Sequence, residues 1–141
     1  MSKNEITLTP YLHFHGNCEE ALNTYQKILD GKVEIVQRYD NPAMQAPDYY
    51  KNKILHAKFH FANYDVYASD AFPVRAENDV NSNVALSLSL SNLEMAQKVY
   101  YLLSEGGKIG VPFAKQFWGD WHGNFIDRFG IRWMVNVEND K

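Results

Sequence analysis

Histidines are the side chains whose spacing most clearly points to chemistry. Four of the five occur as two pairs, His13 with His15 and His56 with His60. Alternate residues of a strand face the same side, so each pair shares one face of a strand. Imidazoles titrate near neutral pH and bind zinc or nickel, which predicts a general base at His13 or His56, or a metal site built from two or three imidazoles. No Asp or Glu stands at a paired spacing to complete such a site, so the pattern favours polar residues on a solvated or hydrogen-bonded sheet face.

A single cysteine and two aspartates are the other reactive candidates. One cysteine excludes an intramolecular disulfide and a Cys-rich zinc site. Cys18 lies in the first turn of a predicted helix, where the dipole favours a thiolate, although a small packed residue is the favoured interpretation. Asp70 could hold a substrate group or cap a turn, and we favour capping. Asp127 is predicted to stabilise the turn before Gly130.

Two similar helical patterns must position these residues. The segments 17–20 and 91–94 read as capping boxes that begin helices. Gly31 and the pair Gly106-Gly107 then predict left-handed helix ends. One apolar face is expected on each helix. Its members are Ala21, Leu22, Tyr25, Ile28 and Leu29 in the first helix, and Ala96, Val99, Tyr100 and Leu103 in the second.

Strand patterns surround both helices and indicate an internal repeat. The segments 11–15 and 84–89 precede the helices, and 31–36 resembles 107–112 after them. Segment 55–61 alternates apolar and polar residues, as a half-buried strand does. Further strands are expected at 66–69, 108–117, 121–126 and 132–137. With Leu12, Phe14, Leu55, Phe59 and Phe61 toward the helices, the four paired histidines would face the other way.

Two loops divide this pattern. Residues 40–53 form either a plain surface loop or a flap over a pocket, and residues 71–83 form a linker. We therefore expect one domain over 1–141, with a first βαβββ module at 8–70 and a second at 84–138.

Composition narrows the class of protein. The 141 residues are 45% hydrophobic and 14% aromatic, enough for one domain with a core. A net charge of −3 without a Lys/Arg run argues against nucleic acid as a partner. No apolar run approaches the roughly 18 residues of a membrane span, and no signal-peptide pattern is present. We therefore expect a cytoplasmic protein without a membrane partner.

Two segments carry a resemblance to a known family. The opening 9–22 and the closing motif, with Phe117-Trp118-Gly119, Gly123 and 127–133, resemble PhnB-like proteins of the vicinal-oxygen-chelate superfamily. The resemblance covers about 9–137. It implies an α+β fold in which paired βαβββ modules form curved mixed sheets around a cleft, the glyoxalase/bleomycin resistance fold. It also implies a homodimer. An older demethylubiquinone methyltransferase label for this group has little support, since no glycine-rich loop for a methyl-donor nucleotide is present.

The resemblance also implies where a metal would bind. Metal-dependent members of the superfamily use His/Gln and Glu ligands from the first and fourth strands of each module. The corresponding positions here are Thr9 or Pro10, Tyr67 or Ser69, Val84 or Ala85, and Met134. None is His or Glu, and a thioether is a poor ligand for hard cations. We therefore predict no metal site of this type and no cofactor, with a divalent metal at the histidines as the alternative.

A mixture of aromatic and polar residues is expected to face the cleft that the resemblance implies. Phe117, Trp118, Trp121 and Phe125 cluster in the sequence, and alternate residues of two strands add polar groups. Such a mixture suits a small organic ligand. Core and dimer packing is the competing interpretation, and it explains Trp133, Val135 and Val137. The predicted ligand-binding residues are Tyr67, Ser69, Phe117, Trp118, Met134 and Asn136.

Three functions are compatible with these features. The preferred one is a metal-independent protein that binds a small organic molecule. The first alternative is a lyase, isomerase or dioxygenase of the glyoxalase type that uses an atypical histidine metal site. The second is a structural or regulatory dimer without a small ligand.

Overall fold

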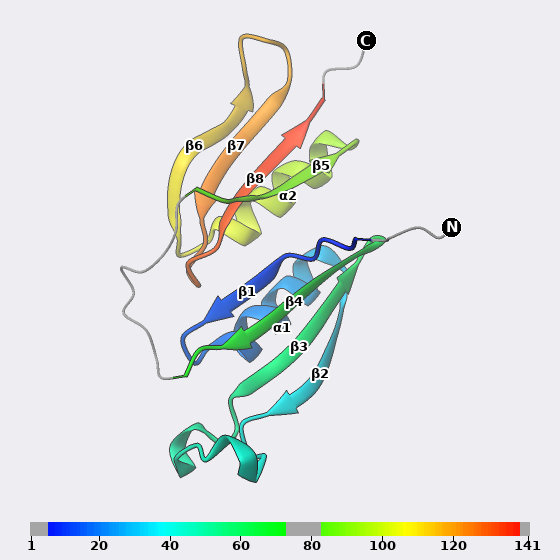
Figure 1. The fold of residues 1–141 in the computed structure, drawn as a ribbon. Helices are drawn as coiled ribbons and strands as arrows, with labels where there is room; N and C mark the ends of the chain where they lie inside the picture. Colours follow the sequence, from blue (N-terminus) through cyan, green and yellow to red (C-terminus); the bar gives the residue numbers. More distant parts are fainter. Residues whose placement is uncertain (1–5, 73–82, 139–141) are drawn as a thin grey trace, which may run out of the picture. The chain divides into compact units, whose positions relative to one another are not determined.

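The structure is a computed structural model that describes residues 6–72 and 83–138. The chain divides into two compact units, Met1–Arg75 and Ala76–Lys141. Each unit consists of one helix and one four-stranded sheet, and each is described by itself below (Figure 1). Neither helix is long and apolar enough to cross a membrane, as judged on the described part of the chain.

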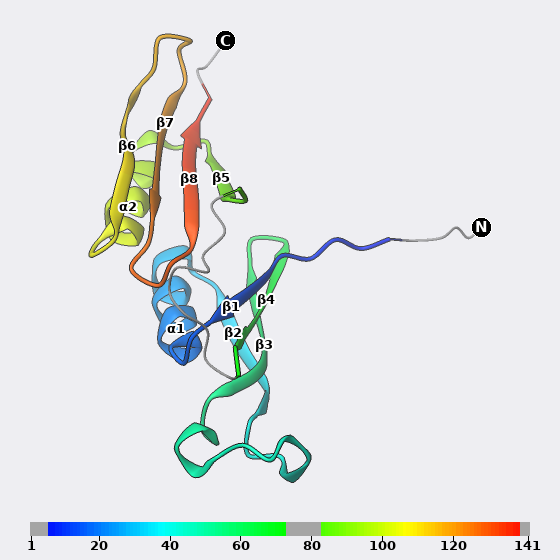
Figure 2. The ribbon, with the colours of Figure 1, turned by 60° about the vertical axis from the view of Figure 1, so that its left-hand side comes forward.

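The first unit follows a βαβββ order. Its elements are β1 (Tyr11–Phe14), α1 (Cys18–Leu29), β2 (Lys32–Arg38), β3 (Ile54–Phe61) and β4 (Tyr64–Asp70), with two short 3-10 turns, η1 (Pro42–Met44) and η2 (Asp48–Tyr50), between β2 and β3. The strands form sheet A in the order β1-β4-β3-β2, with β1 parallel to β4 and the other neighbours antiparallel. Helix α1 packs on one face of this sheet (Figures 1 and 2).

The second unit repeats this topology. Its elements are β5 (Leu86–Leu90), α2 (Leu93–Ser104), β6 (Lys108–Lys115), β7 (Trp121–Ile126) and β8 (Arg132–Val137). They form sheet B in the order β5-β8-β7-β6, again with one parallel pair, β5 with β8. The prediction of two βαβββ modules with mixed sheets is therefore confirmed. Of the predicted linker 71–83, residues 73–82 lie outside the described residues.

Each helix buries its predicted face against its own sheet. Ala21, Leu22 and Tyr25 of α1 are buried, as are all four predicted residues of α2, whereas Ile28 and Leu29 are only half-buried. Burial of this apolar surface is the main driving force for packing helix on sheet. Trp133, Val135 and Val137 of β8 are buried too, so their assignment to the core is confirmed.

Leu55 differs from the prediction that it would face a helix. Arg38 pairs with Ile54 and Gln37 pairs with His56, which leaves Leu55 as an extra residue in a β-bulge. A bulge changes the side to which nearby residues point. Leu55 consequently packs against a small cluster formed by Tyr39, Ala46 and Tyr50 of the 40–53 loop.

Both helix starts differ in detail from the predicted capping boxes. Asn17 makes no side-chain cap on α1. Instead, Asp70 Oδ1 accepts hydrogen bonds from the backbone N–H groups of Gly16 (2.8 Å) and Cys18 (2.9 Å). In α2 the cap is Asn92 rather than Ser91, and it accepts from Met95 N–H at 2.8 Å. A carboxylate distant in sequence can replace a local cap because the free N–H groups need only an acceptor.

The first helix end is also corrected. The left-handed residue after α1 is Asp30, with φ 55°, and not Gly31. Gly31 is required by close packing instead, since a Cβ there would lie 2.5 Å from the Phe59 ring. After α2 the prediction holds, because Gly106 has φ 77°.

The 40–53 loop is fastened to the end of β4. The Tyr39 hydroxyl donates to the Asp70 carbonyl at 2.8 Å, and the Tyr50 hydroxyl donates to the Ala71 carbonyl. The two rings pack edge to face with centroids 5.2 Å apart. Burial raises the pKa of Tyr50 to about 12, so this hydroxyl stays a donor at neutral pH. A role of this loop as a flap stays a prediction.

Candidate functional site

The face of sheet A opposite α1 collects most of the residues predicted to do chemistry. We call it the A face and define it by Tyr11, His13, His56, Lys58, Tyr67 and Ser69. These residues alternate along β1, β3 and β4 with residues that are buried toward the helix, such as Phe14, Phe59 and Ala68. Strand alternation thus separates the core from this face.

Tyr11 is the centre of the A face. Its ring stacks on His13 and His56, with centroids 4.9 Å and 5.7 Å away, and its hydroxyl lies 2.9 Å from His56 Nδ1. Tyr67 meets this group edge-on, 6.0 Å from Tyr11 and 5.2 Å from His56. Tyr11 keeps 43% of its surface exposed, so the group offers aromatic surface to solvent.

Two polar side chains complete the A face. Lys58 Nζ lies 5.5 Å from the centre of the Tyr67 ring, within the range of a cation–π contact. Ser69 Oγ lies 3.3 Å from His13 Nδ1. The structure therefore brings the catalytic candidates His13 and His56 together with the ligand-binding candidates Tyr67 and Ser69.

His15 and His60 lie apart from the Tyr11 group. His60 Nδ1 lies 2.5 Å from Asp65 Oδ1, and its Nε2 lies 3.5 Å from Glu34 Oε1. The hydrogen bond to Asp65 raises the pKa of His60 above its ordinary value. His15 follows β1, and its buried Nδ1 has no hydrogen-bond partner among the described residues. Of the four paired histidines, only His13 and His56 contact Tyr11.

The face of sheet B opposite α2 carries a hydrogen-bonded network around His122. We call it the B face and define it by Ser87, His122, Asn124, Met134 and Asn136. His122 Nδ1 lies 2.7 Å from Asn136 Oδ1, and His122 Nε2 lies 3.0 Å from Asn124 Nδ2. Asn136 Nδ2 donates to Ser87 Oγ at 2.9 Å and to the Leu88 carbonyl at 3.3 Å.

This network assigns one tautomer to His122. Because the Asn136 amide nitrogen donates to Ser87, its oxygen faces His122 and must accept from Nδ1–H. Nε2 then carries no proton and accepts from the Asn124 amide. Both ring nitrogens are therefore satisfied within the network.

The sequence reasoning missed His122, although a signal was present. Within 121–126, His122 and Asn124 alternate with Gly123 and Phe125, which is the pattern used for the other histidines. Strand register shows its place in the repeat. Lys58 pairs with Tyr67, and Asn124 pairs with Met134. His56 and His122 each lie two residues earlier on the third strand, so they are counterparts.

The same register settles which fourth-strand residue matches Met134. Lys32 follows Gly31 and pairs with His60, and Lys108 follows Gly107 and pairs with Ile126. Two residues before His60 and Ile126, Lys58 pairs with Tyr67 and Asn124 pairs with Met134. Tyr67, rather than Ser69, is therefore the counterpart of Met134, and Ser69 is the counterpart of Asn136.

The remaining predicted aromatics separate into turn and core. Trp118, 53% exposed, and Phe117, 95% exposed, lie in the turn between β6 and β7. Their rings meet edge to face at 4.9 Å, and Trp118 lies 6.4 Å from His122. Phe125 was expected near a cleft, but it is buried against Tyr100 of α2 at 5.2 Å, because its position in the β7 alternation points to the helix. Trp121 packs on Phe113.

The donor set does not fit the metal centre of the superfamily. The matching fourth-strand side chains are a phenol at Tyr67 and a thioether at Met134, and neither suits a hard divalent ion. Thr9, Pro10, Val84 and Ala85 precede β1 and β5. The described residues contain no group of three or more His, Cys, Asp or Glu that could hold a metal. His13 and His56 both stack on Tyr11, with each Nδ1 near a hydroxyl, rather than pointing at one shared position.

Cys18 and the two aspartates serve the scaffold. Cys18 is fully buried, and burial raises the pKa of its thiol, so desolvation outweighs the helix dipole that favours a thiolate. Asp70 binds the N–H groups of the α1 start and also Ile54 N–H at 2.9 Å. Asp127 accepts from Phe129 N–H, Ile131 N–H and Trp133 Nε1–H, which confirms its role in the turn.

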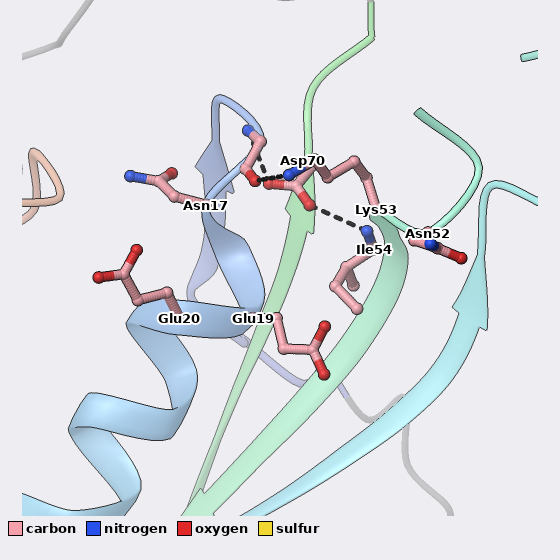
Figure 3. Close-up of a pocket in the computed structure, with 8 residues that line it drawn as sticks. Asn17, Glu19, Glu20, Asn52, Lys53, Ile54 and Asp70 are labelled. Atoms are coloured by element: carbon pink, nitrogen blue, oxygen red, sulfur yellow. Dashed lines mark hydrogen bonds between the residues drawn. The ribbon is translucent and has the colours of Figure 1, made fainter. Parts of the chain in front are cut away.

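A surface hollow of about 250 Å³ opens at the start of α1 (Figure 3). It is lined by Gly16, Asn17, Glu19, Glu20, Asn52, Lys53, Ile54 and Asp70. Asp70 is the one residue among these that was considered above as a substrate contact, and none of the predicted ligand-binding residues lines the hollow. Its inner polar groups satisfy one another, since Lys53 Nζ donates to the Gly16 carbonyl at 2.7 Å and Asp70 binds three N–H groups. We regard it as a consequence of the Asp70 anchor.

Comparison with known proteins identifies relatives of the whole chain. Residues 6–136 match the family model described as 3-demethylubiquinone-9 3-methyltransferase. Protein YjdN of Escherichia coli (strain K12) is 31% identical, over 94% of this chain and 95% of that protein. Protein PA1353 from Pseudomonas aeruginosa, whose crystal structure is known, is 33% identical to this chain with a TM-score of 0.83. The match covers 96% of this chain and 100% of the PA1353 chain.

A PhnB protein from Bacillus cereus has a TM-score of 0.82 at 22% identity, over 94% of this chain and 100% of its own, which shows a shared fold. Solved glyoxalase/bleomycin resistance/dioxygenase proteins share the fold at still lower identity. Together with the two βαβββ units, these matches establish that the chain belongs to the family described as 3-demethylubiquinone-9 3-methyltransferase, and that it has the fold of glyoxalase/bleomycin resistance/dioxygenase proteins.

Proposed function

We propose that this protein binds a small organic molecule on the sheet faces opposite its helices, without the metal centre of the glyoxalase-type enzymes. The observation that carries the proposal is the Tyr11 group of the A face. It combines exposed aromatic surface with a few hydrogen-bonding atoms, which is the composition of small-molecule sites. Tyr67, Ser69, Met134 and Asn136 are the proposed ligand contacts on the sheets, with Phe117 and Trp118 contributing from the β6–β7 turn.

The methyl transfer named in the family description is not what the described residues support. Methyl-donor nucleotides are commonly held by a glycine-rich turn at the switch point of a doubly wound parallel sheet. Here both sheets are mixed, with a single parallel pair each. The proposal therefore follows the residues of the site rather than the family's description.

Enzymatic use of the histidines is the second candidate. Its support is the contact between the Tyr11 hydroxyl and His56 Nδ1, a pair that could pass a proton to or from a bound molecule. The metal-dependent form of this candidate would need ligands beyond His13 and His56 that the described residues do not provide.

Self-association and a cytoplasmic location belong to the same proposal. Each sheet has two edge strands, β1 and β2 in sheet A, and β5 and β6 in sheet B. Edge strands tend to be covered by pairing or by another chain, which supports a homodimer. Light scattering at micromolar concentration should give twice the chain mass of 16.3 kDa, and a monomer would contradict this part of the proposal.

Native mass spectrometry of protein isolated from cells without chelator tests the main proposal. We expect a small-molecule adduct on the wild-type protein, its loss in Tyr67→Ala, and far less than one metal ion per chain by elemental analysis. Stoichiometric metal that disappears in His13→Ala or His56→Ala would favour the metal enzyme instead. Neither adduct nor metal would favour a structural or regulatory dimer. A Tyr64→Ala variant, with an exposed tyrosine at the far end of β4, is the matched control.

A further inference from the structure

We propose that the ligand of the A face is a planar aromatic acid, a flat ring that carries a carboxylate or a similar anion. This inference rests on the proposed function and adds the chemical class of the ligand. Three features of the face support it: ring surfaces for stacking and, among the residues that the structure describes, a cation without a counter-ion and a hydrogen-bond donor without an acceptor.

The stacking surface is provided by four rings of one connected group. His13, Tyr11 and His56 are stacked in pairs, with interplanar angles of 20° and 25°. Tyr67 stands nearly perpendicular to both Tyr11 and His56, at 85° and 89°. Parallel rings with an edge-on neighbour form a step on which a further flat ring can stack against one face and meet the edge of another.

Lys58 provides the charge. It makes no ion pair within the described ranges 6–72 and 83–138, and its Nζ rests over the Tyr67 ring. Glu34 is its direct partner in the β2–β3 pairing, but the Glu34 carboxylate is directed to His60, which also binds Asp65. The two acids of this region thus share one imidazole, and the ammonium beside the rings is left for a ligand.

The Tyr11–His56 pair provides the unused donor. If the Tyr11 hydroxyl donates to Nδ1, the neutral imidazole carries its proton at Nε2. If Nδ1–H donates to the phenol oxygen, the phenol keeps its own hydrogen. In both tautomers one N–H or O–H remains after the contact is made. A carboxylate is the natural acceptor for such a donor beside an ammonium, because charge-assisted hydrogen bonds are the strong ones.

The test compares two probes of the same ring, 2-naphthoate and 2-naphthalenemethanol, by NMR titration of the full chain at low ionic strength. We expect 2-naphthoate to bind at least about tenfold more tightly, with the largest shifts at the amides of Tyr11 and Tyr67. Lys58→Met keeps the apolar stem and removes the charge. It should reduce the preference to within about twofold, and an amide spectrum as dispersed as that of the wild type shows that the variant is folded. Adding salt should lower the preference in the wild type.

Lys27→Met is the matched control, since it removes the same charge from an exposed position on α1. It should retain the wild-type preference. Equal binding of both probes, or a preference that Lys58→Met does not change, would overturn the aromatic-acid inference while leaving the binding function intact. Failure of both probes to shift the Tyr11 and Tyr67 amides would instead count against the A face as a binding surface, and therefore against the proposed function as well.

Discussion

The A face and the B face stand at equivalent places in two units of identical topology, yet they are built in different ways. On the A face, tyrosine and histidine rings stack at the surface, and within the described residues one donor has no acceptor and the Lys58 ammonium has no carboxylate partner. On the B face, His122 has both nitrogens bound by Asn136 and Asn124. A duplicated scaffold can therefore carry hydrogen-bonding atoms that are left over in one copy and satisfied by neighbouring side chains in the other.

The comparison teaches that strand position alone does not assign a role. His56 and His122 are counterparts by register, but only one of them has a hydrogen-bonding atom left over. Arg132 at the start of β8 is an exception to the hydrogen-bonded character of sheet B. Its Nε is buried and has no hydrogen-bond partner among the described residues. We attribute the difference between the faces to the neighbours that each strand supplies, rings in sheet A and amides in sheet B.

The largest expected effect concerns stability. Each unit contains one buried aspartate that binds three donors, so both units should lose stability to a similar degree when it is removed, although their faces differ. Asp70→Ala and Asp127→Ala should each lower the free energy of unfolding by about 3 kcal/mol, because each leaves three donors without an acceptor. Urea denaturation measures both. Asp48→Ala, which removes only an exposed ion pair with Lys51, should stay within about 0.5 kcal/mol of the wild type. A loss below about 1 kcal/mol for either buried aspartate would contradict the equivalence.

The second prediction concerns the two counterpart histidines. His122→Ala should lower the free energy of unfolding by about 2 kcal/mol. It removes the hydrogen-bond partner of the Asn136 oxygen and of the Asn124 amide nitrogen, both in partly buried positions. His56→Ala removes an exposed hydrogen bond to Tyr11 and the ring contacts with Tyr11 and Tyr67, and it should cost less, about 1 kcal/mol. Thermal unfolding of the pair is the measurement. Equal costs, or a larger cost for His56→Ala, would remove the distinction between the faces.

A smaller effect is expected when a residue of one face replaces its counterpart. Tyr67→Met places on the A face the side chain that the B face has at this position. It removes the ring contacts with Tyr11, His56 and Lys58 and should lower the free energy of unfolding by about 1 kcal/mol. The conservative Met134→Leu change on the B face should cost less than that. If chemical denaturation gave no loss for Tyr67→Met, the rings of the A face would not act as a connected group.

The smallest effect is a pH dependence confined to sheet A. Because Asp65 and Glu34 raise the folded-state pKa of His60, the protonated form is stabilised by folding. This contribution is fully present below the ordinary histidine pKa of about 6.5 and is lost as the pH rises through the raised value. Partial exposure screens it, so it should stay below about 1 kcal/mol.

His60→Gln should remove this pH dependence from the free energy of unfolding measured between pH 5 and 8. Asp65→Asn should weaken this pH dependence, because the hydrogen bond to Asp65 is the main cause of the raised pKa of His60. If the stability of His60→Gln fell with rising pH as much as that of the wild type, another group would be responsible.

Sequence patterns predicted much of the fold because they report short-range geometry. The segments 121–126 and 132–137 were predicted with the bounds of β7 and β8, and the apolar face of α2 was predicted residue by residue. The predictions were wrong where a residue distant in sequence, or an irregularity of strand pairing, determined the local structure. Asp70 replaces Asn17 at the start of α1, and the bulge at Leu55 alters the alternation that the sequence shows. Neither effect can be read from neighbours in sequence.

By itself, the sequence determined the two βαβββ repeats, the side of each strand that is polar, and the absence of His and Glu from the fourth-strand positions of the superfamily's metal centre. The first two properties depend on residue type and on periods of two and 3.6, which are local, and the third follows from the metal positions that the family resemblance implies. Tertiary structure decided which polar residues meet. Contacts between β1 and β3 join Tyr11 to His56 across 45 positions of chain, and contacts between β7 and β8 enclose His122 between two amides. Hydrogen bonds and ring contacts depend on strand order and register, which only the folded sheet supplies.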